Sequence, residues 1–251
     1  TLKRGEIRGL VGENGSGKST IMSIASGMQP ETSGEMFYKG KPWKPDTMVT
    51  AQEQGISMIL QEANTIPGVT VAQNIFAGHE EHFTKFGIVN MKKMFAEAQK
   101  LLEKFGISHI KARDSIDKYN FENRKLIEIV RCVTDETEIL VVDETTTALS
   151  LDGREILYKI VHRMAEEEDK AVVFISHDMD EILDQCNVLT VLRDGDIIGE
   201  ISKEDMLAAK TEGKKRQEVM KRARYMMVGR EIGEKYYRED YDTSHADAVA
   251  L

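Results

Sequence analysis

The apolar residues of this chain fall into short continuous runs, separated by longer segments in which they recur at helical spacing. Short runs without polar alternation predict strands buried on both faces, as in a parallel sheet. Their alternation with helices predicts an α/β fold with a mostly parallel, doubly wound sheet. We expect strands at residues 7–11, 34–41, 56–60, 138–143, 171–175, 188–192 and 197–201, the last two joined by a hairpin that closes on Asp194-Gly195.

A helical pattern interrupts these strands from residue 70 to about residue 133. It is clearest from Met91 to Phe105, where apolar residues recur every three or four positions, with Asn90 suited to the N-cap and Gly106 to the C′ position. This pattern predicts an inserted α-helical subdomain. Further helices are expected at 151–167 and after a capping box at Ser202–Asp205. We therefore divide the chain into a core (1–66 and 135–201), a helical insertion (67–134) and a helical, charged tail (202–251).

Composition narrows the class of protein. The 251 residues, 41% of them hydrophobic, fit one α/β domain with an inserted subdomain. A net charge of -9 argues against a general nucleic-acid binder, and no apolar stretch approaches the ~20 residues that cross a bilayer. The two cysteines, Cys132 and Cys186, lack metal-site spacing, which favours buried, reduced thiols. Because Thr1 lies so close to the first strand, we expect further strands upstream.

Between the first strand and the next helix the chain carries a phosphate-binding loop of the form G-x-x-x-x-G-K-[ST]. Its glycines let the backbone surround an anion, toward which the N–H groups of the following helical turn point. The lysine supplies positive charge for the outer phosphates, and the hydroxyl after it can ligate Mg²⁺. The predicted site for a nucleoside triphosphate comprises Gly12, Glu13, Asn14, Gly15, Ser16, Gly17, Lys18, Ser19 and Thr20.

Other polar residues follow predicted strands directly. Asp143 and Glu144 end a run of four aliphatic residues, Gln61 follows the strand at 56–60, and His177 follows the strand at 171–175. Because the carboxyl ends of parallel strands form one edge, where ligands bind, we expect these side chains to meet there. In phosphate-loop NTPases, an acid at such a strand end holds Mg²⁺ and a second acid can orient the attacking water.

This order of motifs resembles that of the ATP-binding cassette (ABC) ATPases: phosphate loop, glutamine, helical insertion, acid pair and histidine. The local sequence is similar to the N-terminal cassette in ATPases of bacterial monosaccharide importers of the ribose, galactose and xylose type. That similarity lies in Gly12–Gly15, Thr70–Gly78, Ile175–His177 and Met226–Arg230. The resemblance covers about residues 5 to 200 and resumes at 226–232.

The resemblance implies a P-loop ATPase that binds ATP and Mg²⁺ and pairs head to tail with a second cassette. Ser19, Gln61 and Asp143 would hold the metal, and Glu144, His177 and Gln61 would be catalytic. Glu144 would polarise water, His177 would contact the γ-phosphate, and Gln61 would couple the site to the helical insertion. The segment around 66–73 would contact a transmembrane permease. The chain would lie peripherally on the cytoplasmic face of the membrane and serve, indirectly, an extracytoplasmic sugar-binding protein, without binding nucleic acid.

The chain departs from this family in the signature sequence, normally Leu-Ser-Gly-Gly-Gln. Its counterpart is Tyr119–Lys125, which has lost its glycines and has Asn120 in place of serine. Glu122 would place a carboxylate near the partner's γ-phosphate, where like charges repel, unless Arg124 offsets it. We therefore expect an active site that joins this phosphate loop to another cassette's signature. The closing residues 248–251 suit the first strand of a second cassette.

Other interpretations of the sequence stay open. The degraded signature suits a scaffold that binds ATP but hardly hydrolyses it, whereas Glu144 and His177 favour an enzyme. A soluble ABC ATPase of translation or DNA repair is a third class, and a nucleoside or signalling sugar would suit the same residues as a simple sugar. The basic stretch 214–224 reads as a solvated helix face or as a contact with a partner or anionic lipid.

Overall fold

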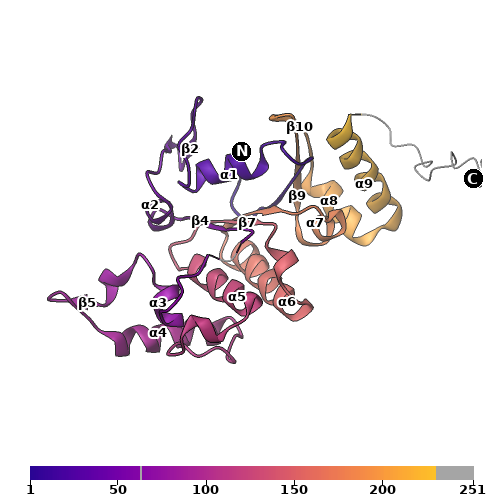
Figure 1. Cartoon of the computed structure of the whole chain (residues 1–251). Coiled ribbons are helices and arrows are strands. Elements are labelled where there is room, and N and C mark those ends of the chain that lie inside the picture. The colour runs from indigo at the N-terminus through magenta and orange to yellow at the C-terminus, as the bar shows by residue number, and fades with distance from the viewer. Residues whose placement is uncertain (63, 230–251) are drawn as a thin grey trace, which may run out of the picture.

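A computed structural model describes residues 1–62 and 64–229 of the chain (Figure 1). Its main sheet has six strands in the order β10-β9-β1-β8-β7-β4. Five of them are parallel, and β10 pairs antiparallel with β9. The predicted α/β class with a mostly parallel sheet is therefore confirmed. The strands are β1 (Ile7–Val11), β4 (Ile56–Ile59), β7 (Ile139–Asp143), β8 (Ala171–Ile175), β9 (Val188–Arg193) and β10 (Asp196–Ile201).

Strand register brings the predicted site residues to one edge of the sheet. Leu10 of β1 and Asp143 of β7 both lie opposite Ile175 of the strand between them, β8. Val142 pairs in turn with Ile59 of β4. The residues that follow these positions therefore leave the sheet at its carboxyl edge.

Helices cover both faces of the sheet. In Figure 1, α1 (Lys18–Ala25) and α2 (Met48–Glu53) lie on one face, and α5 (Phe121–Cys132) and α6 (Leu151–His162) lie on the other. Alternate residues of β7 enter different clusters: Leu140 and Val142 pack with α5 and α6, whereas Val141 packs on the side of α1. Burial on both faces explains why this strand is wholly aliphatic before its terminal acid.

The segment at 67–134 is helical only in part. It contains α3 (Val71–Ile75), α4 (Met91–Lys104) and the whole of α5. It also contains a hairpin of β5 (Thr84–Lys85) and β6 (Ile88–Val89). The expectation of helical structure throughout is thus wrong at this hairpin, whose turn residues Phe86 and Gly87 both have positive φ. The predicted ends of α4 are confirmed, since Asn90 accepts a hydrogen bond from the Lys93 N–H (3.1 Å) and Gly106 has a φ of 75°.

Two further details differ from expectation. The segment at 34–41 forms no strand of the main sheet; it belongs to a separate hairpin of β2 (Phe37–Tyr38) and β3 (Lys41–Pro42). The helix expected at 151–167 is α6 followed by a π-helical turn at Arg163–Glu167. The hairpin turn at Asp194-Gly195 is confirmed, with φ angles of 53° and 88°.

The tail begins with α8 (Lys203–Thr211), whose N-cap Ser202 accepts a hydrogen bond from the Asp205 N–H at 3.2 Å. The basic stretch lies in α9 (Gly213–Val228). Its Arg216 forms ion pairs with Asp180 and Asp184 of α7 (Met179–Gln185), at 2.7 and 2.6 Å. This arginine therefore fastens the tail to the core, while Lys214, Lys221, Arg222 and Arg224 are exposed.

The acidic stretch at 231–242 and the expected strand at 248–251 lie outside the described residues. Within the part of the chain that is described, no helix has the length and apolar character to cross a bilayer. Cys132 and Cys186 are buried free thiols, as expected for packing residues. Burial raises the pKa of the Cys132 thiol to about 11 and raises that of Cys186 as well.

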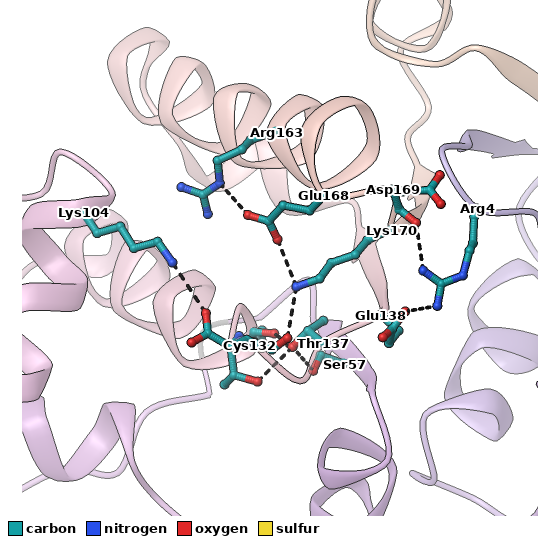
Figure 2. Close-up of polar contacts among 12 residues, drawn as sticks. Arg4, Ser57, Lys104, Cys132, Thr137, Glu138, Arg163, Glu168, Asp169 and Lys170 are labelled. Carbon is teal, nitrogen blue, oxygen red and sulfur yellow. Dashed lines mark hydrogen bonds and ion pairs between the residues drawn. The ribbon is translucent and has the colours of Figure 1, made fainter.

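At the amino edge of the sheet, opposite the carboxyl edge that carries the candidate site, charged side chains form ion pairs with one another (Figure 2). Glu168 accepts from Arg163 at 3.1 Å and pairs with Lys170 at 2.9 Å, and Arg4 pairs with Glu138 at 2.8 Å. These contacts join the segments that lead into β1, β7 and β8. The charged side chains at the amino edge therefore stabilise the fold by pairing with one another. The candidate site residues lie at the carboxyl edge.

Candidate functional site

The phosphate loop has a conformation that requires its glycines. A Cβ atom on Gly12 would lie 2.2 Å from the carbonyl oxygen of Leu192, so no larger residue fits without moving the backbone. Gly15 and Gly17 have φ angles of 83° and 97°, in the left-handed region that glycine adopts readily. Gly17 is also the N-cap of α1, which places the first N–H groups of that helix at the loop.

Lys18 lies inside the loop, with only 5% of its surface exposed. Its ammonium group donates hydrogen bonds to the carbonyl oxygens of Gly12 (2.9 Å) and Glu13 (3.0 Å). Burial lowers the pKa of Lys18, and the nearby carboxylates of Glu144 and Asp143 act in the opposite direction. The lysine is thus held in place and is paired with carbonyl oxygens that phosphate oxygens can replace.

Ser19 and Asp143 meet across the site. The Ser19 hydroxyl donates to Asp143 Oδ1 at 3.3 Å, joining the start of α1 to the end of β7. Burial raises the pKa of Asp143, and the neighbouring Glu144 adds to this increase, against the hydrogen bond from Ser19. A hydroxyl and a carboxylate are oxygen donors of the kind that Mg²⁺ prefers, so these two residues fit that cation.

Glu144 and His177 form a close pair beside this position. The distance between Glu144 Oε1 and His177 Nε2 is 2.6 Å, and the two side chains are 17% and 48% exposed. Glu144 has a left-handed backbone conformation (φ 46°, ψ 25°), and its N–H donates to Ile175 O at 3.0 Å. A partly exposed carboxylate can accept a proton from water, and an imidazole can contact an anion.

Gln61 leaves β4 at the same edge, beyond Asp143 as seen from the phosphate loop. Its side chain is exposed, and among the described residues no hydrogen bond joins it to the other candidates. Its backbone neighbours are held firmly: Lys125 Nζ donates to Leu60 O at 2.5 Å and to Glu62 O at 2.9 Å. The structure thus brings Lys18, Ser19, Asp143, Glu144 and His177 together and places Gln61 at the border of that group.

The polar groups of the signature counterpart are engaged within the chain itself. Asn120 caps α5 by accepting from the Asn123 N–H at 2.9 Å. Glu122 accepts from the N–H of Ser150 at 3.0 Å and from the Ser150 hydroxyl, at the start of α6. Arg124, which could offset the charge of Glu122, contacts other groups: its Nε donates to Tyr119 O at 2.9 Å, and its guanidinium pairs with Asp117 at 3.7 Å.

Sequence reasoning missed three buried charged residues near the site. Lys125 and Glu128 form an ion pair at 2.9 Å with 0% and 1% of their side chains exposed. Their only sequence signal is a pair of charges three residues apart within an otherwise apolar helix face. Glu181, in α7, is the third, and it follows two acids in a segment that reads as a polar surface.

Comparison with known proteins shows the family to which the chain belongs. Residues 1–147 match the family model described as ABC transporter. The chain is similar to the ribose import ATP-binding protein RbsA of Shouchella clausii, with 36% identity over 242 residues, 96% of this chain and 46% of that protein. It is also 34% identical, over 239 residues, to ribose import ATP-binding protein RbsA 2 of Escherichia coli O157:H7, covering 95% of this chain and 44% of that protein. The chain thus spans less than half the length of these relatives.

Solved structures agree on the fold. One is a dimeric, post-hydrolysis state of an ATP-binding cassette bound to ADP and Pi, with a TM-score of 0.69 and 22% identity. The match covers 81% of this chain and 88% of that one. The family model accounts for the phosphate loop and the acid pair in one continuous match. The chain belongs to the ABC transporter family.

Proposed function

We propose that this chain is the ATP-binding and ATP-hydrolysing cassette of an importer for a simple sugar, and that it drives transport through a membrane permease. The similarity to ribose import ATP-binding proteins over 95% of the chain supports the transport of a sugar. The observation that carries hydrolysis is the 2.6 Å contact between Glu144 and His177 beside Lys18, Ser19 and Asp143.

Each residue has a distinct task in this proposal. The loop N–H groups and Lys18 bind the phosphates of ATP. Ser19, Asp143 and Gln61 would hold Mg²⁺, which would supply positive charge against the charge that develops on the phosphates. Glu144 orients the attacking water and accepts its proton, and His177 contacts the γ-phosphate.

The site requires a partner. Since Asn120 and Glu122 are engaged within this chain, we propose that the signature of a second cassette completes the site on Lys18. The opposite site, which would use Tyr119–Lys125, would turn over poorly. The permease would contact the segment around 66–73 and would receive solute from an extracytoplasmic sugar-binding protein, with this chain on the cytoplasmic face of the membrane.

The test is MgATP hydrolysis by this chain at rising protein concentration, with Glu144→Gln as the control. We expect ATP binding together with almost no turnover, and turnover that appears when a cassette with an intact signature is added. Binding without turnover in that mixture would instead support a scaffold, which the inward contacts of Asn120 and Glu122 also favour. Turnover that rises steeply without a partner and is lost in the control would contradict the proposed division of labour.

A further inference from the structure

A buried carboxylate lies behind the Glu144–His177 pair and has no task in the function proposed above. Glu181 is 8% exposed and begins the inner face of α7. Its Oε2 accepts hydrogen bonds from the hydroxyls of Ser176 (2.5 Å) and Thr146 (3.1 Å). Its Oε1 accepts from the Tyr158 hydroxyl at 2.5 Å. Three hydroxyl donors therefore converge on one buried side chain.

The two donors to Oε2 come from different loops. Ser176 immediately precedes His177 after β8, and Thr146 lies two residues beyond Glu144 after β7. A single oxygen atom thus ties together the two segments that carry the proposed reacting pair. Hydrogen bonds to an ionised acceptor are roughly twice as strong as neutral ones, so a carboxylate suits this task better than a neutral acceptor.

The conformations of the two loops give this connection a task. Glu144 has positive φ, a conformation that a non-glycine residue keeps only where its surroundings hold it. His177 is about half exposed, and its ring contacts Glu144. The bond from the Glu144 N–H to Ile175 O joins the two segments before the reacting pair, and the Glu181 contacts add a second connection, at Thr146 and Ser176.

A role for Glu181 in capping its own helix does not account for its contacts. The start of α7 is already capped, because Asp178 Oδ1 accepts from the N–H groups of Asp180 (2.9 Å) and Glu181 (3.3 Å). The Glu181 side chain instead reaches α6 through Tyr158. Burial and the bond to Glu181 raise the pKa of the Tyr158 hydroxyl, which therefore stays protonated as a donor.

We propose that Glu181 is a positioning residue for hydrolysis, which fixes the loops of Glu144 and His177 at their contact distance by accepting the hydroxyls of Thr146 and Ser176. This inference rests on the proposed function, in which Glu144 and His177 act on ATP. Glu181 itself touches neither nucleotide nor water in the reaction.

The first test measures the geometry without hydrolysis. The imidazole NMR signals of His177, assigned by their loss in His177→Asn, should move in Glu181→Gln in the direction that Glu144→Gln moves them. Asp184→Asn is the matched control, since Asp184 lies on the same helix and its carboxylate pairs with Arg216 at 2.6 Å on the outer side. Unchanged His177 signals in a folded Glu181→Gln chain would overturn the proposal.

The second test separates positioning from stability. With a partner cassette present, Glu181→Gln should lower kcat by about 10–100-fold, the scale expected when reacting groups are displaced by about 1 Å, and leave the KM for ATP unchanged. Ser176→Ala and Thr146→Val should each lower kcat less, and adding either to Glu181→Gln should have little further effect, because all three remove one network.

The outcomes are distinguishable. A fall in activity that merely follows the unfolded fraction of Glu181→Gln would assign the residue a structural role and contradict the proposal. If the wild type and Glu144→Gln hydrolyse ATP equally slowly with every partner, the proposed function fails instead. The NMR comparison then still decides whether Glu181 sets the Glu144–His177 contact.

Discussion

Two regions of this molecule differ in what their polar groups contact. The phosphate-loop edge, which comprises Lys18, Ser19, Asp143, Glu144 and His177, gathers side chains from the start of α1 and from the carboxyl ends of β7 and β8. The signature segment, Tyr119–Lys125, directs its polar groups into its own chain: to the start of α5, to Ser150 and to the backbone beside Gln61. We infer from this difference that the first region is arranged for a ligand, whereas the second stabilises its own chain.

The largest effect should come from the centre of the phosphate-loop edge. Lys18→Ala removes the ammonium group that lies inside the loop and leaves the carbonyl oxygens of Gly12 and Glu13 to face the phosphates of a bound nucleotide. We expect the heat of MgATP binding to vanish in calorimetry, with the unfolding temperature of the nucleotide-free chain changing much less. Lys214→Ala is the contrasting change, because that lysine is exposed on α9, outside the loop. Retained MgATP heat in Lys18→Ala would remove the loop lysine from binding.

Glu144→Gln should separate binding from chemistry. The amide keeps the size of the side chain but cannot accept a proton from water, so hydrolysis should fall by roughly 10²–10⁴-fold, the usual contribution of a positioned base. MgATP affinity should stay near that of the wild type. The measurement is single-turnover hydrolysis with a partner cassette, beside calorimetry on the same samples. Wild-type turnover in this variant would exclude Glu144 as the base.

Lys125→Met tests the signature segment by stability rather than by activity. This change leaves Glu128 as an uncompensated buried charge, which typically costs about 3–5 kcal/mol of folding free energy. The double variant Lys125→Met, Glu128→Leu should recover much of the lost folding free energy. Urea unfolding measures both effects, with Arg124→Met, a partly exposed neighbour, as the control. If Lys125→Met alone were as stable as the wild type, the ion pair would not anchor the loop of Gln61.

Much of the fold follows from local pattern. The wholly aliphatic run before Asp143 identified β7, since only a strand covered on both faces needs such a run, and register then placed Glu144 and His177 together. The hairpin β5–β6 escaped prediction, and the strand expected at 34–41 is the separate hairpin β2–β3, because two-residue strands carry no periodicity. The helices α2 and α7 were missed as well; in α2 Ala51 is the buried residue, so the apolar stripe is too narrow to read.

The buried charges show why the site could not be completed from sequence. A lysine in an amphipathic helix reads as a surface residue, yet Lys125 is fully buried because the carbonyl oxygens of Leu60 and Glu62 come to it from a distant part of the chain. Glu181 likewise depends on hydroxyls from two separate loops. Such partners are set by tertiary packing, and local spacing does not encode them.

The smallest effect is expected from the double change Asn120→Ala with Glu122→Ala. Removing an N-cap costs about 1 kcal/mol of stability, and the loss of the Glu122–Ser150 contact adds to that. MgATP affinity at the phosphate-loop edge should nevertheless stay within about twofold, as for changes distant from a site. Because we propose that the signature segment does not serve the nucleotide on Lys18, turnover in the assembly with a second cassette should also persist. Abolished turnover in that assembly, with binding intact, would show that Tyr119–Lys125 still takes part in catalysis, and the contrast between the two regions would then be wrong.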